Sequence, residues 1–292
     1  MQQLVNTLLG GLTLGTVYAA FALALVMIWR STRIVNFAQA PMAMITTFLA
    51  LRIIEAGHSY WLAFAAALLA GLALGAVVER ALVRRVEGKP EVNAVILTLG
   101  LFVVFHALAA VVFGNRFRPF PAPFGIRGLE VGDTTIALTG FGIFTILSVL
   151  TVMGLLVLLF HATDLGLRMR AAAFNHEVAR VLGVRVGRLL TLGWALAALV
   201  GSLAGLLIAG GGLVHPGYMD AVVVYGFVAA VLGGLDSSAG AVVGGLLLGL
   251  SLSLVSGYVG SELVPLTALA ILMLVLLLRP QGLFSRVSER RV

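Results

Sequence analysis

Residues that could carry out catalysis or hold a cofactor are scarce in this sequence. It contains no Cys, which excludes disulfides, thiol nucleophiles and thiolate metal sites. The histidines lack the spacing of metal ligands; they are His58, His106, His161, His176 and His215. No Gly-x-x-x-x-Gly-Lys-Ser/Thr sequence occurs, and the nearest fragment is Gly88-Lys89-Pro90. We therefore expect no metal, no cofactor and no phosphate-binding loop in this chain, and we find no residue set for an intramembrane enzyme.

The composition indicates a membrane protein. Of the 292 residues, 61% are hydrophobic and 11% are Asp, Glu, Lys or Arg, against about 25% charged residues in an ordinary soluble domain. Such a chain cannot cover a water-facing surface with polar groups, and it is too hydrophobic to be disordered. The sequence predicts an all-α, polytopic transmembrane helix bundle that forms a single domain over residues 1–292.

Runs without charged residues mark the expected spans, because a charge at the bilayer centre costs roughly 2.5–3.5 kcal/mol on insertion scales. The runs cover residues 1–29, 34–51, 56–78, 92–115, 134–163, 189–219, 221–235, 237–261 and 263–278. We count about nine spans, within a range of about 8–10. Glu79 and Arg80 stand at the end of the third run, where we expect both to snorkel into water. The first run lacks a basic start and a cleavage pattern, so we expect it to stay in the membrane.

Pairs of glycines four residues apart indicate close helix packing. They are Gly11 and Gly15, Gly71 and Gly75, Gly201 and Gly205, Gly240 and Gly244, and Gly245 and Gly249. Small residues at this spacing let two helix backbones approach each other in lipid. Together the pairs predict a compact bundle of many helices, without identifying its activity.

The basic residues are divided unevenly between the two sides of the predicted bundle. With about nine spans, fifteen of the 19 Lys and Arg residues fall on one side. The positive-inside rule assigns that side to the cytoplasm, with the N-terminus outside and the C-terminus inside. Nucleic-acid binding is not expected, because these residues flank membrane helices and form no separate basic domain.

The connection formed by residues 161–188 has the features of an amphipathic helix that Gly183 can end. At about 100° per residue, one apolar stripe contains Leu167, Ala171, Phe174, Val178, Val181 and Leu182. Such a helix either lies on the inner leaflet or docks into a groove of a soluble partner. His176 and Glu177 favour the protein partner, because a lipid-facing helix would favour Lys and Arg.

Several segments, in this order, resemble one protein family. They are Ile34-Val35-Asn36-Phe37-Ala38, the stretch Gly166-Leu-Arg-Met-Arg-Ala-Ala-Ala-Phe-Asn-His-Glu-Val-Ala-Arg-Val-Leu-Gly183, the helix from Trp194 to Gly205, the turn Gly233-Gly234-Leu235-Asp236-Ser237-Ser238, and the ending Arg279-Pro280-Gln281-Gly282-Leu283-Phe284. The chain is similar over nearly its whole length to the branched-chain amino-acid ABC transporter permease family, in its LivH-like inner-membrane subunit.

The resemblance implies an importer with several subunits in the lipid of a bacterial plasma (inner) membrane. These are a homologous second permease that forms a heterodimer with this chain, two cytoplasmic ABC ATPases that bind ATP and Mg, and an extracytoplasmic substrate-binding protein. ATP hydrolysis is then expected in the ATPases, and this chain is not an enzyme.

The resemblance also makes residues 166–182 the coupling helix, seated in a groove of an ATPase. The residues assigned to ATPase coupling are Arg170, Phe174, Asn175, His176, Glu177, Val178, Arg180 and Gly183. Phe174 and Val178 are expected as apolar anchors, and Gly183 as the turn back to the membrane.

The span interrupted by Pro41 is our candidate for the translocation path. A broken helix at membrane depth usually lines a cavity or is buried in protein. The predicted path residues are Asn36, Phe37, Gln39, Thr46 and Thr47. The alternative interpretation is an interfacial helix start that is capped by Asn36.

Two departures from the family pattern leave the substrate open. Gln39, Ala40 and Pro41 stand where the family often has His, Gly and an acidic residue, and Asp236 replaces a Gly in the turn after Gly234. We expect branched-chain or other hydrophobic amino acids, with urea or short amides as the alternative within the family. A stand-alone channel or secondary carrier is the alternative outside it.

Overall fold

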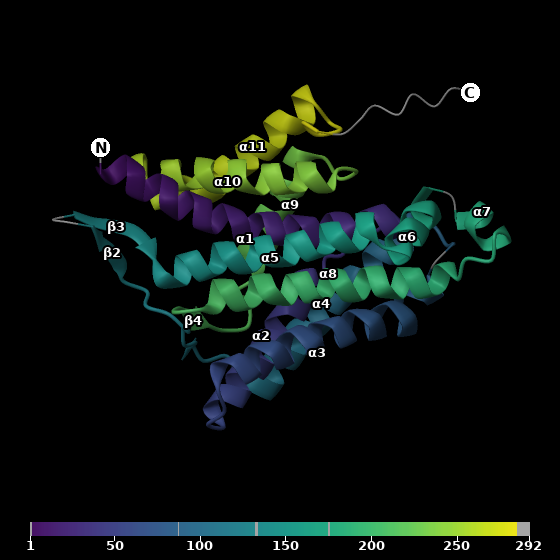
Figure 1. Cartoon of the computed structure of the whole chain (residues 1–292), viewed down its shortest axis with the longest axis horizontal. Coiled ribbons are helices and arrows are strands. Elements are labelled where there is room, and N and C mark those ends of the chain that lie inside the picture. The colour runs from purple at the N-terminus through teal and green to yellow at the C-terminus, as the bar shows by residue number, and fades with distance from the viewer. Residues whose placement is uncertain (1, 87, 132–133, 175, 285–292) are drawn as a thin grey trace.

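A computed structural model describes residues 2–86, 88–131, 134–174 and 176–284 (Figure 1). Its longer helices are α1 (Gln2–Thr32), α2 (Gln39–Glu55), α3 (Tyr60–Ala81), α4 (Glu91–Phe113), α5 (Gly140–Ala162), α8 (Val186–Ala209), α9 (Asp220–Gly233), α10 (Ser238–Tyr258) and α11 (Val264–Leu278). The shorter elements are η1 (Val83–Arg85), α6 (Asp164–Phe174), α7 (His176–Val181), η2 (Ser261–Leu263), and strands β1 (Arg118–Pro119), β2 (Gly128–Val131), β3 (Thr134–Thr139) and β4 (Leu213–Val214). The predicted all-α bundle is confirmed.

The expected spans correspond to helices of two lengths. Within the described ranges, seven helices are long and apolar enough to cross a membrane. A crossing helix needs about 20 residues, whereas α2 has 17 and α9 has 14. Both shorter helices adjoin a non-helical turn: residues 33–38 precede α2, and the turn after Gly233 follows α9. The count of about nine spans therefore combines full-length helices with these two shorter ones.

Helices α1 and α8 form the centre of the bundle. In α1, 83% of the most apolar stretch is buried, against 11% in α11. Helix α1 packs against α10, α9, α8 and α5, and α8 packs against α3 and α2 as well (Figure 1). Both central helices are apolar on all sides, which is typical of a helix surrounded by other helices.

Glycines bring these helices into close contact, as the pairs predict. A Cβ on Gly11 would lie 3.0 Å from the Cα of Leu250 in α10. One on Gly75 would lie 2.5 Å from the carbonyl oxygen of Trp194 in α8. Every glycine of the five predicted pairs has such a neighbour in another element. The backbones of α1 and α10, and of α3 and α8, therefore meet without intervening side chains.

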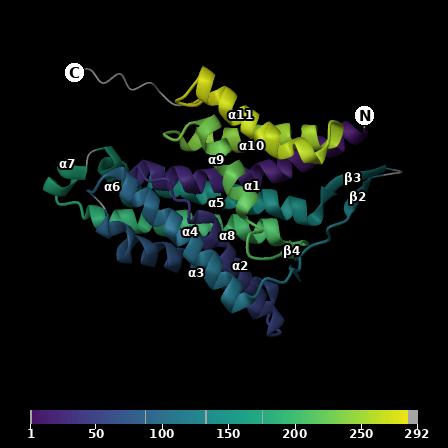
Figure 2. The same cartoon turned by 180° about the vertical axis from the view of Figure 1, so that it is seen from behind.

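The two ends of the bundle differ in charge and structure. At one end, Arg33 after α1 pairs with Asp236 between α9 and α10, and Arg84 after α3 donates to the carbonyl of Gly187 in α8. Helices α6 and α7 extend from this same end (Figures 1 and 2). At the other end, the β2–β3 hairpin lies beside the start of α1, and β1 pairs with β4 in antiparallel register. The basic connections after α1, α3 and α5 thus meet at one end, which we call the basic end.

Candidate functional site

The segment predicted to form one coupling helix contains two helices in the structure, α6 and α7. The hydroxyl of Thr163 accepts a hydrogen bond from the backbone N–H of Gly166 at 3.1 Å, which stabilises the first turn of α6. Asn175 lies outside the described residues, as do the side chains of Phe174, His176, Glu177 and Arg180. The segment is helical on both sides of residue 175 and lies at the basic end.

Ala172, Ala179 and the partly buried Leu165 and Met169 attach α6 and α7 to the bundle, while other apolar side chains are exposed. Ala172 and Ala179 are buried against Val186, Leu189 and Leu190, in the first turns of α8. The exposed members of the predicted apolar stripe include Leu167, Val178, Val181 and Leu182, and Val181 is 87% exposed. We call these four residues the exposed stripe. Ala172 and Ala179 let the helices approach α8 closely, while Leu167, Val181 and Leu182 lie at the surface of the segment.

Two glycines shape this segment. Gly183 follows α7 with φ +79°, in the left-handed region that favours glycine. The N–H of Val184 then donates to the carbonyl of Ala179 at 2.9 Å, which closes the expected turn back toward the bundle. Gly166 packs on the last turn of α5, where a Cβ would overlap the carbonyl group of Phe160. The sequence analysis missed this role of Gly166, because the contact depends on the angle between α5 and α6.

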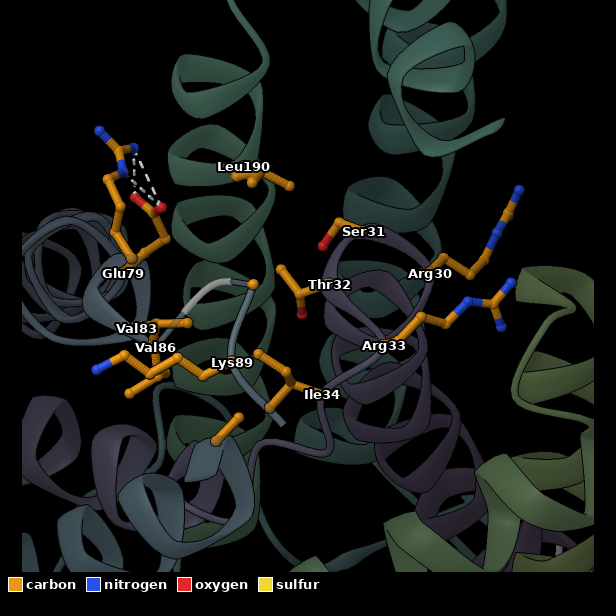
Figure 3. A pocket seen from close by; sticks show the side chains of 13 residues that line it. Arg30, Ser31, Thr32, Arg33, Ile34, Glu79, Val83, Val86, Lys89 and Leu190 are labelled. Carbon is orange, nitrogen blue, oxygen red and sulfur yellow. Dashed lines mark hydrogen bonds and ion pairs between the residues drawn. The ribbon is translucent and has the colours of Figure 1, made fainter. Parts of the chain in front are cut away.

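A buried ion pair ties the end of α3 to the start of α8. Glu79 is 1% exposed, so the snorkelling predicted for it is wrong, whereas Arg80 is exposed. The Glu79 carboxylate accepts hydrogen bonds from Arg84 at 3.0 and 3.1 Å, drawn as dashed lines at Glu79 in Figure 3. It also accepts a hydrogen bond from the hydroxyl of Thr191 at 2.6 Å. Arg84 also donates to the carbonyl of Gly187 at 2.6 Å. A carboxylate removed from water requires such partners; we call this arrangement the α3–α8 ion pair.

Replacement of Glu79 by Gln is expected to reduce the free energy of unfolding by about 1–2 kcal/mol, because Arg84, whose side chain is 36% exposed and partly screened by water, loses its counter-charge. The measurement is the thermal unfolding of the purified chain in mild detergent. Arg80→Gln removes a neighbouring exposed charge and should change the free energy by less than about 0.5 kcal/mol. Equal stability of Glu79→Gln and Arg80→Gln would show that the ion pair does not hold α3 to α8.

Four of the five predicted path residues are buried where α2 packs against α8. They are Asn36, Gln39, Thr46 and Thr47, each at most 1% exposed. The amide of Asn36 donates to the Gln39 side chain at 3.0 Å, and the Gln39 amide donates to the carbonyl of Ala197 at 2.8 Å. The Thr46 hydroxyl lies 2.9 Å from that of Ser202 and donates to it. We call these four residues with Ser202 the polar seam; its buried polar groups are satisfied by these two bonds to α8 and by local bonds, such as that of Thr47 to the carbonyl of Ala43 at 2.9 Å.

The polar seam lies deep within the bundle. Ala197, the partner of Gln39, is near the middle of the 24-residue α8, about 16 Å from its start at 1.5 Å per residue. Gly201 and Gly205 of α8 provide the space for the side chains of Gln39 and Thr47. The start of α2 is therefore buried in protein at membrane depth, which is one of the two situations that permit a broken helix there.

Residues 33–38 lead from α1 to this buried helix start. Asn36 Oδ1 accepts a hydrogen bond from the N–H of Ala38 at 3.1 Å, which holds the turn before α2. Phe37, the fifth predicted path residue, is half-buried. Arg33 begins the segment with φ +57° and pairs with Asp236. Asp236, which departs from the family pattern in the α9–α10 turn, thus contacts the segment that precedes α2.

A cavity of about 270 Å³ lies beside this segment at the basic end. It is bordered by the ends of α1 and α3, by η1, and by the starts of α4 and α8. Ser31 and Thr32 extend toward the cavity in Figure 3, whereas Arg30 and Arg33 extend away from it. Ile34 lines the cavity two positions before Asn36, so the cavity reaches close to the polar seam.

Histidine and acidic side chains meet in pairs in the part of the chain that the structure describes. Among the described residues, no group of three or more His, Cys, Asp or Glu side chains is arranged to hold a metal ion. His106 of α4 instead contacts Asp220 at the start of α9, with 3.0 Å between Nε2 and Oδ1. The groups that the structure brings together are suited to packing and hydrogen bonding between helices.

The sequence matches a known family along most of its length. Residues 7–278 match the family described as branched-chain amino acid transport system, permease component. The chain belongs to this family. The resemblance recognised from the sequence motifs is therefore confirmed, and this chain is a transport permease.

Relatives of this permease match it from end to end. It is 29% identical to the high-affinity branched-chain amino acid transport system permease protein LivH of Salmonella typhimurium, over 100% of this chain and 97% of the relative. It is 27% identical to the permease protein BraD of Pseudomonas aeruginosa, over 100% of this chain and 98% of the relative. The solved structure of PsaBC from Streptococcus pneumoniae in complex with Fab shares the fold, with a TM-score of 0.52 at 18% identity, over 96% of this chain and 93% of that chain.

Family membership and the helices agree on the location of this permease. Its seven membrane-length helices in the described ranges, together with its relatives, identify a multi-pass inner-membrane protein. The exposed leucines and valines of α4, α5 and α11 are then the surface that faces lipid or another membrane subunit.

Proposed function

We propose that this permease forms half of the translocation path of an ATP-driven importer for branched-chain or other hydrophobic amino acids. The observation that carries the proposal is the exposed stripe on α6 and α7, at the basic end of a chain with full-length permease relatives. Exposed apolar side chains on a helical segment fit a groove on a partner protein. The chain has no phosphate-binding loop, so ATP and Mg are assigned to two cytoplasmic ATPase subunits.

The basic end is assigned to the cytoplasm, with the N-terminus outside, by the positive-inside rule. Coupling is assigned to residues 161–188, with contacts from Arg170, Phe174, Asn175, His176, Glu177, Val178, Arg180 and Gly183. The α3–α8 ion pair supports a mechanical role for this segment, because it joins α3 to the turn of α8 that directly follows α7. Rocking of α6 and α7 would then move α3 and α8 as one body.

The path is assigned to the polar seam and Phe37, opposite a homologous second permease. Separation of α2 from α8 would expose the amides of Asn36 and Gln39 and the hydroxyls of Thr46 and Thr47 to an open channel. These neutral groups can hydrogen-bond the ammonium and carboxylate of an amino acid in transit without holding it tightly. Selectivity is then left to the extracytoplasmic binding protein.

Purification from the native membrane in mild detergent, followed by reconstitution in vesicles, tests the proposal. We expect a second permease and two phosphate-loop ATPases to copurify, and uptake of labelled leucine to require ATP and the binding protein. Recovery of this chain alone, with uptake driven by an ion gradient and indifferent to ATP, would identify a stand-alone carrier. Inhibition of uptake by urea or acetamide, but not by isoleucine or valine, would assign the alternative substrate class.

A further inference from the structure

A second cavity, a groove of about 280 Å³, lies between α1, α5 and α10 at the basic end. Helix α1 lies between α5 and α10, and it contacts both of them (Figures 1 and 2). Met169 and Arg170 of α6 line the groove where α6 leaves the bundle, and Gly193 of α8 lines it as well. The groove is separate from the polar seam, whose residues do not line it.

The groove has an apolar part and a basic rim. The apolar part is lined by Leu23, Met27, Met153, Leu156, Val157 and Phe160. The rim carries Arg30, His161 and Arg170, together with the hydroxyls of Ser31 and Ser238. No Asp or Glu is among the described residues that line the groove. An occupant that matches this lining is apolar over much of its length and negatively charged at one end.

The basic rim lies where the membrane helices end. Arg30 belongs to the last turn of α1, His161 to the last turn of α5, and Ser238 is the first residue of α10. In a membrane these positions are at headgroup depth, while the apolar part of the groove extends into the hydrocarbon. The wall formed by α5 is exposed there, since Val157 is 57% exposed. Lipid therefore has direct access to the groove from the side.

We infer that this groove binds one anionic phospholipid from the leaflet at the basic end. Its phosphate would lie between Arg30 and Arg170, with an acyl chain against Met27 and Leu156. Basic pockets between transmembrane helices hold such headgroups. Arg30 donates to Ser238 at 2.8 Å, which keeps its guanidinium at the rim. A free amino acid fits less well, because the lining offers no carboxylate for its ammonium group.

The inferred lipid would connect the bundle to the proposed coupling segment. Arg170 belongs to α6, whereas Arg30 ends α1 and bonds the start of α10. A phosphate shared by both arginines would hold α6 near α1 and α10. This inference rests on the membrane location of the chain and not on its proposed substrate or ATPase partners.

Lipid retention by the purified full chain, with any subunits that accompany it, tests the inference. Phosphatidylglycerol and phosphatidylcholine with the same acyl chains are added in mild detergent, and the bound lipid is counted by native mass spectrometry. We expect phosphatidylglycerol to bind at least ~10-fold more tightly than phosphatidylcholine, because the rim carries only positive charge. The Arg30→Gln/Arg170→Gln variant should lose at least ~10-fold in affinity for phosphatidylglycerol, since both positive charges expected to face the phosphate are removed.

Two further variants test whether the loss of affinity depends on which charges are removed and on the space in the groove. Arg168→Gln/Arg188→Gln removes two exposed arginines of the same end that do not line the groove, and it should keep wild-type affinity. Ala239→Trp fills the groove without a change of charge and should also lose phosphatidylglycerol. Glycerol phosphate, the soluble headgroup, should not displace the lipid.

Several results would overturn the inference. Displacement by glycerol phosphate would indicate a site for free phosphate. Equal affinity for the two lipids would show that the lipid does not bind in the groove. Wild-type affinity in both Arg30→Gln/Arg170→Gln and Ala239→Trp would show the same. Loss of the lipid whenever a second permease is bound would assign the groove to the contact between the two permeases.

Discussion

The Val181→Asp/Leu182→Asp variant is expected to insert at wild-type levels and to lose ATP-driven uptake. Both side chains are exposed, at 87% and 76%, so the change removes no packing within the chain. Carboxylates placed in an apolar groove of an ATPase should weaken its binding by about 2 kcal/mol or more, which is roughly 30-fold. The measurements are retention of the ATPases in a pull-down and uptake by membrane vesicles.

A matched control is available at the opposite end of the bundle. Val259, which caps the end of α10, is 67% exposed, and Val259→Asp adds a carboxylate there. Retention of the ATPases should be unchanged in this variant. Normal ATPase retention in Val181→Asp/Leu182→Asp would instead favour the other interpretation of the segment, a helix that lies on the membrane surface.

Gly249→Val is expected to prevent assembly of a stable bundle. Gly249 of α10 faces the backbone of Gly15 in α1, and a Cβ there would overlap the Cα of Gly15. Backbone atoms cannot turn aside as a flexible side chain does, so the cost should reach the upper end of core overpacking, about 3 kcal/mol or more. Because α1 is the central helix, the whole bundle depends on this contact. We expect at least a ~10-fold lower yield of monodisperse protein after detergent extraction, as follows from a stability loss of this size.

Gly154→Val provides the control for this substitution. Gly154 lies in α5, and a Cβ added there meets no atom within 4 Å. The variant should be extracted with the same yield and thermal midpoint as the wild type, because the added methyl groups face lipid. Equal yields for Gly249→Val and Gly154→Val would mean that α1 and α10 do not pack as the structure has them.

The positions of the helices followed from patterns that are local in the sequence. A run without charges predicts a span wherever it occurs, and the runs agree with the long helices of the described ranges. The two shorter helices also had local signals, Pro41 near the start of α2 and Gly233-Gly234 at the end of α9. The sequence could not show that the segment before α2 returns to mid-depth, because that path depends on the space that the glycines of α8 leave for Gln39 and Thr47.

Sequence patterns predicted only part of the structure of the coupling segment. Its 3.6-residue periodicity identified the apolar stripe, and the structure adds that much of the stripe is exposed. The fully buried residues of α6 and α7 in the contact with α8 are Ala172 and Ala179, whose small size gives them a weak signal in a hydrophobic pattern. Gly183 could be identified from its place after the periodic residues, whereas Gly166 required the structure of the α5–α6 joint.

By itself, the sequence determined that this chain lies in a membrane, where its helices run, which connections carry the positive charge and to which family it belongs. The first three properties depend on how each segment interacts with lipid and water, so each can be recognised one segment at a time. The family can be recognised from motifs that are each continuous in the sequence. Only the tertiary structure decided that Glu79 is paired, and that the polar seam is closed against α8. It also decided that the basic rim of the groove joins α1, α5 and α6. The partners in each case come from distant parts of the chain, such as Thr191, which is 112 residues from Glu79. Which polar groups meet depends on the relative rotation and crossing of packed helices, and no local pattern encodes that geometry.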